Sequence, residues 1–303
     1  MDPRKVRKLN ILLAVDGSEH AMAAARLLND LPLTGDSTIT AVAALVPRDA
    51  ANHATLESAL EQARTVLAGH EIQIETQLLT GSPPEVLIEF ADQHSPDLIV
   101  LGARGLRAAL GILLGGTVQQ IVEYSTWPVL VVRAPYAGLR RILLIVDGSE
   151  YSQRALHYLG RFPLPPDTQV RLMHVLPPMP SPALVARSWP IGTEAVAPIP
   201  SYETEALLSK QAEEEEREGR ALLERARKDL LEDGLSADTV LLRGDAATEI
   251  IEYVKAHQID LIVAGSRGLS PMKRLLLGSL SRKLIHYAGC SVLIVRGGNH
   301  VLD

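Results

Sequence analysis

The sequence predicts an α/β protein of two tandem domains, each with a doubly wound, five-stranded parallel sheet. Three observations lead to this prediction: the length of 303 residues, the composition and an internal repeat. The length fits two domains of roughly 150 residues each. Hydrophobic residues make up 47% of the chain and aromatic residues only 4%. The core must therefore consist of Val, Ile, Leu and Ala, as in buried parallel strands.

The internal repeat divides the chain into two unequal copies. Residues 11–19 return as residues 142–150, at an offset of 131. Residues 97–106 return as residues 260–269, at an offset of 163. The second copy therefore contains 32 more residues than the first.

The extra residues of the second copy lie between about residues 178 and 219. This stretch is rich in proline and ends near the acidic run Glu213–Glu216, so we expect a surface loop followed by an extended amphipathic helix. A short connector with proline and glycine separates the two copies. We expect domain 1 to span residues 1–136 and domain 2 to span residues 137–303.

Strands and helices alternate within each copy. Apolar runs predict the strands, and Ser18 and Pro84 stand at helix starts, as a cap and in the first turn respectively. Because the elements alternate, right-handed crossovers give a parallel sheet with helices on both faces. In the first copy we expect strands at Asn10–Val15, Thr38–Leu45, Glu71–Leu79, Leu98–Leu101 and Pro128–Val132, and helices after Ser18 and at Leu56–Leu67, Pro84–His94 and Val118–Tyr124.

Charge and cysteine content exclude several classes of protein. The net charge of −6 lacks the basic excess that binds nucleic acid, so we expect no nucleic-acid partner. One cysteine, Cys290, allows no internal disulfide and no four-cysteine metal site, which fits the cytoplasm. Only five apolar residues precede Asp16 at the first strand, too few for a signal-peptide core or a membrane span. We expect no metal site and no membrane partner.

A carboxylate follows the first strand of each copy, in the sequences Asp16-Gly-Ser and Asp147-Gly-Ser. Ligands of doubly wound sheets bind beyond the carboxyl ends of the strands, which makes both carboxylates candidate binding residues. The alternative is a strand-to-helix turn in which Ser18 and Ser149 cap helices. Such a turn explains the serine and the glycine better than it explains a carboxylate at the end of an apolar strand.

The loop after the fourth strand of the second copy has the pattern G-x2-G-x9-G-S. Bare backbone at Gly265 and Gly268 lets a phosphate approach main-chain N–H groups. Gly278 then begins a helix, whose N-terminus favours an anion, and Ser279 and Ser281 add hydroxyl groups. The pattern predicts a phosphate cradle. A long loop with a glycine at each bend is the alternative.

The first copy keeps the glycines of this pattern but loses two hydroxyl groups. Gly116 stands in place of Ser279, and Val118 stands in place of Ser281. We therefore expect the two copies to differ, with the tighter binding in domain 2. The residues that the first copy retains are Gly102, Gly105 and Gly115, with Thr117 one position out of register.

Taken together, these motifs resemble the universal stress protein domain, over residues 10–133 and again over residues 140–296. The resemblance implies a Rossmann-like sheet of strand order 3-2-1-4-5 with a nucleotide pocket between strands 1 and 4. It also implies that two such domains pair through their final strands. In a tandem chain this pairing can form a pseudo-dimer within one chain, and a homodimer of whole chains is a further expectation.

The resemblance also implies a ligand, ATP with or without Mg²⁺, and the residues that contact it. In domain 2 the implied binding residues are Ile145, Asp147, Val175, Gly265, Arg267, Gly268, Gly278, Ser279, Leu280 and Ser281. In domain 1 they are Ala14, Asp16, Ala44, Gly102, Arg104, Gly105, Gly115, Gly116 and Thr117.

The leading hypothesis is an ATP-binding stress-response regulatory module without efficient catalysis. Neither copy shows a lysine or arginine finger or a general base placed for hydrolysis. Two alternatives remain: a nucleotide-free dimerising stress protein, and a slow ATPase whose catalytic residue lies in the insertion. Because the hydroxyl groups belong to domain 2, we expect Gly278→Val to weaken binding more than Gly115→Val.

Overall fold

The computed structural model describes residues 8–69, 72–105, 114–179, 202–268 and 277–296. The predicted proline-rich loop lies largely within residues 180–201, outside the described residues. Domain 1 contains β1 (Asn10–Ala14), α1 (Glu19–Asp30), β2 (Thr38–Leu45), the 3₁₀ helix η1 (Pro47–Asn52), α2 (His53–Leu67), β3 (Gln73–Thr80), α3 (Pro83–His94), β4 (Leu98–Gly102), α4 (Gly116–Tyr124) and β5 (Val129–Val132). Domain 2 contains β6 (Arg141–Ile145), α5 (Glu150–Arg161), β7 (Gln169–Leu176), α7 (Tyr202–Glu232), β8 (Ala237–Arg243), α8 (Ala246–His257), β9 (Leu261–Gly265), α9 (Ser279–Tyr287) and β10 (Ser291–Val295).

The described strands form one ten-stranded sheet of order β3-β2-β1-β4-β5-β10-β9-β6-β7-β8. All neighbours within each domain are parallel, and each half has the strand order 3-2-1-4-5. The predicted fold class is confirmed. The expected elements of domain 1 also occur, with their bounds shifted by a few residues. In both halves the winding reverses beside the first strand, where a doubly wound sheet opens a crevice.

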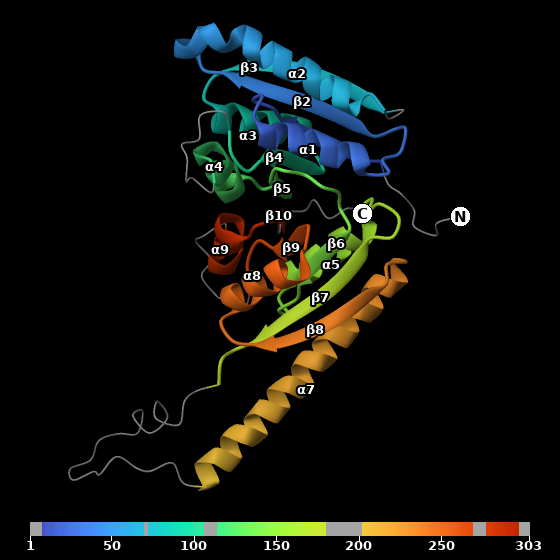
Figure 1. Cartoon of the computed structure of the whole chain (residues 1–303), viewed down its shortest axis with the longest axis vertical. Helices are drawn as coiled ribbons and strands as arrows, with labels where there is room; N and C mark the ends of the chain where they lie inside the picture. The colour runs from blue at the N-terminus through green and yellow to red at the C-terminus, as the bar shows by residue number, and fades with distance from the viewer. Residues whose placement is uncertain (1–7, 70–71, 106–113, 180–201, 269–276, 297–303) are drawn as a thin grey trace, which may run out of the picture.

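The two domains join through their last strands, β5 and β10. These strands run antiparallel, with Val131 opposite Val292 and Leu130 opposite Leu293. Figure 1 shows the two strands where the domains meet. The pairing extends the hydrogen-bonded ladder from one domain into the other, which leaves β3 and β8 at the edges of the sheet. The two repeats therefore form a pseudo-dimer within one chain.

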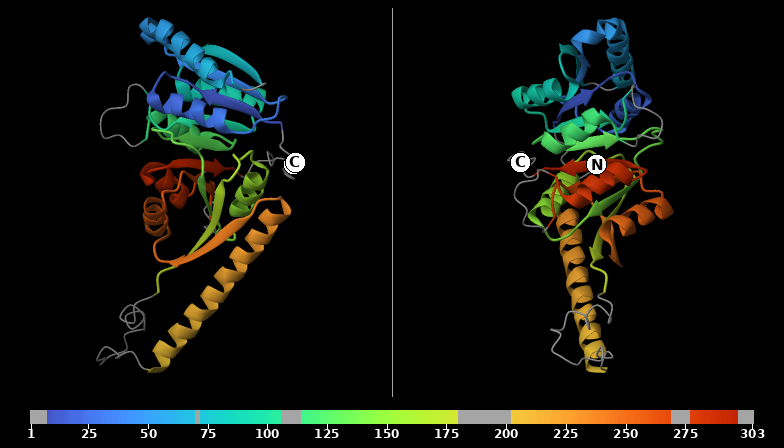
Figure 2. Two further views of the ribbon diagram at one scale, coloured as in Figure 1. Left: turned by 45° about the vertical axis from the view of Figure 1, so that its right-hand side comes forward. Right: turned by 90° about the vertical axis from the view of Figure 1, so that its left-hand side faces the viewer.

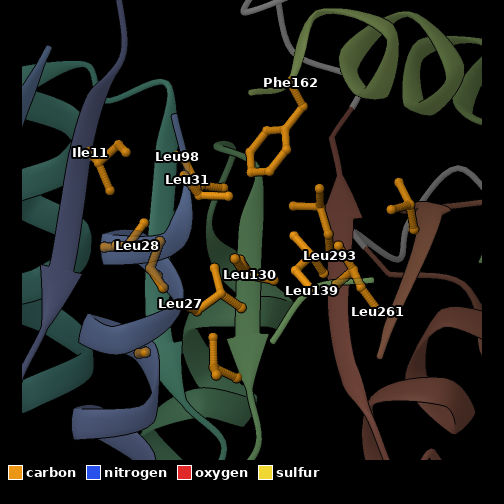
Figure 3. Close-up of a cluster of buried hydrophobic side chains, with 14 of the residues drawn as sticks. Ile11, Leu27, Leu28, Leu31, Leu98, Leu130, Leu139, Phe162, Leu261 and Leu293 are labelled. Carbon is orange, nitrogen blue, oxygen red and sulfur yellow. The ribbon is translucent and has the colours of Figure 1, made fainter. Parts of the chain in front are cut away.

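Hydrophobic side chains fill a layer on each face of the sheet. One cluster lies beneath α1, α2, α5 and α7 and runs across the domain junction, where Leu130, Leu139 and Leu293 meet (Figure 3). A second cluster lies beneath α3, α4, α8 and α9. Both clusters draw residues from both domains, so the apolar core is continuous across the junction.

Polar contacts also cross the junction between the domains. The Tyr158 hydroxyl of α5 donates to the Asp97 carbonyl oxygen of domain 1 at 3.0 Å. The Arg133 guanidinium donates to the Ile285 carbonyl near the end of α9 at 2.7 Å. Arg282 of α9 binds Glu123 of α4 at 3.1 Å. Positive side chains near helix C-termini are favourable because carbonyl groups there carry partial negative charge.

The helix α7 accounts for the main difference in shape between the domains. It has 31 residues, whereas the corresponding helix α2 has 15. Figures 1 and 2 show α7 crossing the face of the sheet beside β7 and β8 and extending beyond the strands. The extended helix predicted after the insertion is therefore confirmed.

Candidate functional site

A cavity of about 640 Å³ lies at the carboxyl edge of the sheet in domain 1. It occupies the crevice between β1 and β4, beneath the start of α4, where the strand order reverses. Its described lining residues are Ala14, Val15, Asp16, Ala21, Val42, Ala44, Leu45, Val46, Asp49, Asn52, Thr55, Leu56, Pro83, Leu87, Leu101, Gly102, Gly105, Leu114, Gly115, Gly116, Thr117, Val118, Gln119 and Ile121.

The turn between β1 and α1 places Asp16 in this cavity. Asp16 Oδ1 accepts a hydrogen bond from the Ser18 backbone N–H at 3.0 Å, and Gly17 has a φ of 80°. Ser18 Oγ caps α1 by accepting from the Ala21 N–H at 3.1 Å. One carboxylate oxygen therefore closes the turn, and the carboxylate still borders the cavity. Asp147, Gly148 and Ser149 repeat the hydrogen bonds in domain 2.

The glycines after the fourth strand permit close packing. A Cβ atom on Gly102 would lie 2.5 Å from the His20 backbone, and one on Gly265 would lie 2.6 Å from the Tyr151 backbone. A Cβ atom on Gly105 would lie 2.5 Å from Asp16 Oδ2. Gly102 and Gly265 thus allow the strand to pack closely against the first helix of each domain, and Gly105 leaves room for the Asp16 carboxylate. These glycines have a structural role even without a ligand.

The start of α4 borders the cavity with backbone N–H groups. Gly115 is the N-cap residue and makes no side-chain capping hydrogen bond, while its own N–H binds the Ala103 carbonyl at 2.9 Å. Gly116 and Thr117 follow it and also line the cavity. Because the first N–H groups of a helix have no partner within the helix, this wall can donate to an anion.

The arginines of the glycine loops lie against the first helix of each domain. Arg104 Nε donates to His20 Nε2 at 3.1 Å, and Arg267 stacks on Tyr151 with 5.6 Å between the guanidinium carbon and the ring centre. Burial, with the Arg104 charge as the second cause, lowers the pKa of His20. Arg104 is not among the residues that line the cavity.

Domain 2 carries larger side chains at the positions of the cavity walls. Ala14 and Ala44 of domain 1 are replaced by Ile145 and Val175, Ala21 by Ser152, and Val42 by Met173. Met173 is fully buried. Gly265 is also buried, whereas the corresponding Gly102 is partly exposed. These substitutions add bulk to the part of domain 2 that corresponds to the crevice.

The hydroxyl groups predicted to distinguish domain 2 have different environments. Ser281 is 3% exposed, and its Oγ donates to the Gly265 carbonyl at 2.8 Å. Ser279 is exposed, and Leu280 packs against the apolar cluster. The Ser281 hydroxyl thus already has a protein acceptor, so it stabilises the loop in the structure.

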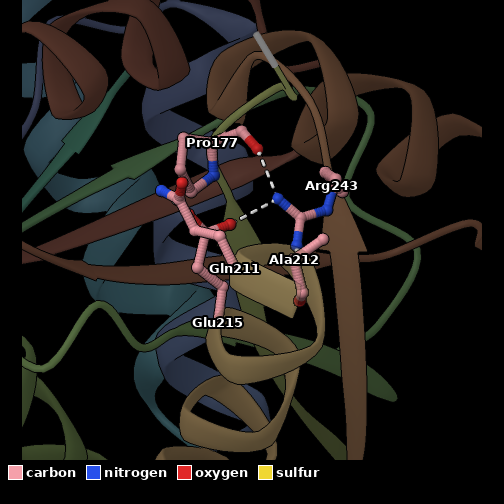
Figure 4. A network of polar contacts seen from close by, with 5 residues as sticks. All are labelled: Pro177, Gln211, Ala212, Glu215 and Arg243. Carbon is pink, nitrogen blue, oxygen red and sulfur yellow. Dashed lines mark hydrogen bonds and ion pairs between the residues drawn. The ribbon is translucent and has the colours of Figure 1, made fainter. Parts of the chain in front are cut away.

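The insertion adds contacts at the carboxyl edge of the sheet in domain 2. Arg243, at the end of β8, donates to the Pro177 carbonyl at 3.1 Å and binds Glu215 of α7 at 2.6 Å (Figure 4). It also donates to the Ala212 carbonyl at 3.2 Å. Pro177 stands at the position of Val46, which lines the cavity of domain 1. A salt-bridged helix therefore lies at the edge where domain 1 has its cavity.

Part of the cavity lining consists of residues that were predicted from the sequence. The structure brings together Ala14, Asp16, Ala44, Gly102, Gly105, Gly115, Gly116 and Thr117 around the cavity. The prediction did not include the residues after β2, of which Asp49, Asn52 and Thr55 line the opposite wall. These residues follow the carboxyl end of β2, and this position in the sequence could have identified them as candidates.

Comparison with known proteins identifies the family. The universal stress protein family model matches residues 9–133 and again residues 138–296. The chain belongs to the universal stress protein family, as a tandem of two such domains.

Two relatives agree with this assignment, and a solved structure agrees with the fold. A universal stress protein of Mycolicibacterium smegmatis is 28% identical, over 94% of this chain and 96% of its own. The universal stress protein YxiE of Bacillus subtilis is 32% identical over 52% of this chain and 98% of its own. The crystal structure of a universal stress protein from Archaeoglobus fulgidus has a TM-score of 0.64 at 18% identity, covering 95% of this chain and 98% of that one.

Two kinds of feature do not occur among the described residues. They contain no helix that is both long and apolar enough to cross a membrane. They also contain no group of three or more His, Cys, Asp or Glu side chains arranged to hold a metal ion.

Proposed function

We propose that domain 1 binds an adenine nucleotide and that the protein works as a nucleotide-dependent regulatory module of the stress response. The observation that carries this proposal is the cavity of about 640 Å³ in the crevice between β1 and β4. Its volume lies within the roughly 300–1,000 Å³ of small-molecule sites. ATP is the nucleotide that the family resemblance implies.

The residues of the cavity fit a nucleotide in two respects. Ala14, Val42 and Ala44 give an apolar wall with short side chains, which leaves space for a flat base. The start of α4, with no side chain capping it at Gly115, offers N–H groups to a phosphate. Apolar and anion-binding surfaces thus border the same space.

We place the nucleotide in domain 1, contrary to the order expected from the loop hydroxyls. The larger Ile145, Met173 and Val175 support domain 2 as the structural half of the pair. In this proposal domain 2 binds no nucleotide and supplies β10 to the shared sheet.

We further propose that the nucleotide is bound without efficient turnover. Asp16 Oδ1 accepts the Ser18 N–H, so this oxygen closes the turn after β1. The described lining includes no Lys, Arg or His to stabilise a transferring phosphoryl group. We place this function in the cytoplasm, because a single cysteine leaves no internal disulfide.

Mass spectrometry after denaturation of freshly purified protein tests the proposal. We expect a released adenine nucleotide, or, if the purified protein is empty, binding of adenine nucleotides measured by calorimetry. Absence of both results would overturn the proposal. Phosphate release at saturating ATP, followed over hours, separates binding from catalysis, and several turnovers per minute would show an enzyme.

A further inference from the structure

The chain that follows β2 forms one wall of the cavity in domain 1. It turns at Val46, whose carbonyl oxygen accepts the Asp49 N–H at 2.8 Å, and continues through η1 into α2. Side chains three residues apart lie on the same side of a 3₁₀ helix and are neighbours on an α-helix. One such stripe, here called the β2 wall, lines the cavity and consists of Val46, Asp49, Asn52 and Thr55.

Asn52 contributes a planar amide to the β2 wall. It is the N-cap residue of α2, with a φ of −85° and a ψ of 0°, and its side chain makes no capping hydrogen bond. The side chain is partly exposed and borders the cavity. A carboxamide carries an acceptor oxygen and a donor NH₂ group side by side, so it can recognise a flat ligand that presents the complementary pair.

The β2 wall lies at the base end of the proposed nucleotide. In the sheet, β2 and β4 flank β1 on opposite sides, and α4 follows β4 along the chain. The proposed function places the phosphate at α4 and the base against Ala14, Val42 and Ala44. The edge of the base therefore meets the chain that follows β2.

Domain 2 uses the position of Asn52 in a different way. At the repeat offset of 163, Glu215 of α7 stands in place of Asn52, and its carboxylate binds Arg243 at 2.6 Å. Gly219 stands in place of Leu56, and a Cβ atom there would lie 2.9 Å from Leu241 Cδ1, so α7 packs tightly against β8. The amide thus belongs to the domain that has the cavity.

From these features we propose that Asn52 is a specificity-determining residue, which binds the edge of adenine that carries the 6-amino group. The inference rests on the proposed function and adds to it a residue outside the glycine loops. Asn52 Oδ1 accepts a hydrogen bond from the 6-amino group, and Nδ2 donates one to an adjacent ring nitrogen. Asparagine recognises adenine through the same pair of hydrogen bonds in the major groove of DNA.

Calorimetry on the whole chain tests this assignment with ATP and purine riboside triphosphate, which lacks the 6-amino group. Wild type should bind ATP about fivefold more tightly than the analogue, because one hydrogen bond is lost with the amino group. In Asn52→Ala the ATP affinity should fall by about fivefold or more, and the ratio of the two affinities should narrow toward one. The fold should not change, since alanine adopts the backbone angles of Asn52 and no capping hydrogen bond is removed.

Two further variants identify the group that reads the base. Gln62→Ala is the matched control, since Gln62 is an exposed amide of α2 that does not line the cavity. It should leave both affinities unchanged. Thr55→Val removes the neighbouring hydroxyl group of the β2 wall and keeps the shape of the side chain. It should leave the ratio of the two affinities as in wild type.

The outcomes separate this inference from the proposed function. If neither compound binds to wild type, the proposed function fails. If ATP binds and the analogue binds equally well, the nucleotide function stands and recognition of the 6-amino group is wrong. A wild-type ratio in Asn52→Ala would overturn the role of Asn52, and a ratio that narrows only in Thr55→Val would assign recognition to the hydroxyl group instead.

Discussion

Domain 1 and domain 2 share one backbone plan, and they differ in the side chains at the carboxyl edge of their central strands. Both have the strand order 3-2-1-4-5 and the same hydrogen-bonded turn after the first strand. Domain 1 places Ala14 and Ala44 at this edge and has a cavity there, whereas domain 2 places Ile145 and Val175.

This comparison indicates that the glycine loop and the cavity lined by the strands are separable features of this fold. The loop that ends in Gly278-Ser279 keeps the fuller set of hydroxyl groups, yet the strands beneath it carry the larger side chains. Close packing means that one or two methylene groups decide whether a crevice stays open. Binding is then expected to depend on strand residues as much as on the loop.

We predict the strongest loss of binding for a variant that gives domain 1 a wall residue of domain 2. Ala14→Ile should weaken nucleotide binding about 100-fold, because the added methyl and ethyl groups occupy the cavity. The matched change Ile145→Ala in domain 2 should leave binding intact and lower the free energy of unfolding by about 2–4 kcal/mol. Calorimetry and denaturant unfolding measure the two effects. Equal affinities of the wild type and Ala14→Ile would show that the ligand binds elsewhere.

The glycines that end β4 and β9 test whether both domains depend on close packing between this strand and their first helix. Gly102→Ala and Gly265→Ala should each lower the free energy of unfolding by about 1–3 kcal/mol, because the new Cβ atom overlaps the first helix. Denaturant titration measures this loss. Gly116→Ala is the control, since nothing lies within 4 Å of a Cβ atom there. A strong effect in one domain only would contradict the shared packing.

The glycines that begin α4 and α9 compare the two loops directly. Gly115→Val should weaken nucleotide binding about tenfold, because the side chain crowds the N–H groups that face the cavity. Gly278→Val should leave binding unchanged, although its Cβ atom would lie 3.3 Å from Arg267 Cα and strain domain 2. The loop hydroxyl groups alone predict the reverse order of the two effects. Calorimetry on both variants decides between them.

The buried hydroxyl of domain 2 gives a smaller effect. Ser281→Ala should lower the free energy of unfolding by about 1 kcal/mol, because the hydrogen bond to the Gly265 carbonyl is lost. Nucleotide affinity should not change. Ser279→Ala is the control, since Ser279 is exposed. A loss of nucleotide affinity in Ser281→Ala, with the free energy of unfolding unchanged, would show that this hydroxyl group binds the nucleotide.

The smallest effect concerns pH and His20, which domain 2 replaces by Tyr151. Since the folded state lowers the His20 pKa below 6.5, the unfolded chain takes up a proton first as the pH falls. The His20 contribution to stability is therefore present above about pH 6.5 and is lost as the pH falls toward the lowered pKa of the folded state. His20→Gln should show a shallower loss of unfolding free energy on acidification than wild type. Identical pH slopes would contradict this role.

The alternating elements and the two copies could be predicted from the residues because those signals were local and repeated, whereas the strand order 3-2-1-4-5 was predicted only from the family resemblance. Apolar strands such as the predicted Leu98–Leu101, helix caps such as Ser18 and the offset between the copies do not depend on distant packing. The extended helix α7 followed from the same kind of pattern. The loop hydroxyls predicted the site less well. Whether Ser281 faces a ligand or the Gly265 carbonyl depends on the tertiary path of the loop.

The pairing of β5 with β10 cannot form until the ribosome has synthesised domain 2. The partner of Val131 is Val292, about 160 residues later in the sequence. At roughly 5–20 residues per second, a ribosome needs on the order of 10–30 s to synthesise that stretch. During this time the nascent chain presents β5 as an unpaired apolar edge, which is open to chaperones and to the same strand of a neighbouring nascent chain. Release of the C-terminal strand from the ribosome ends that exposure.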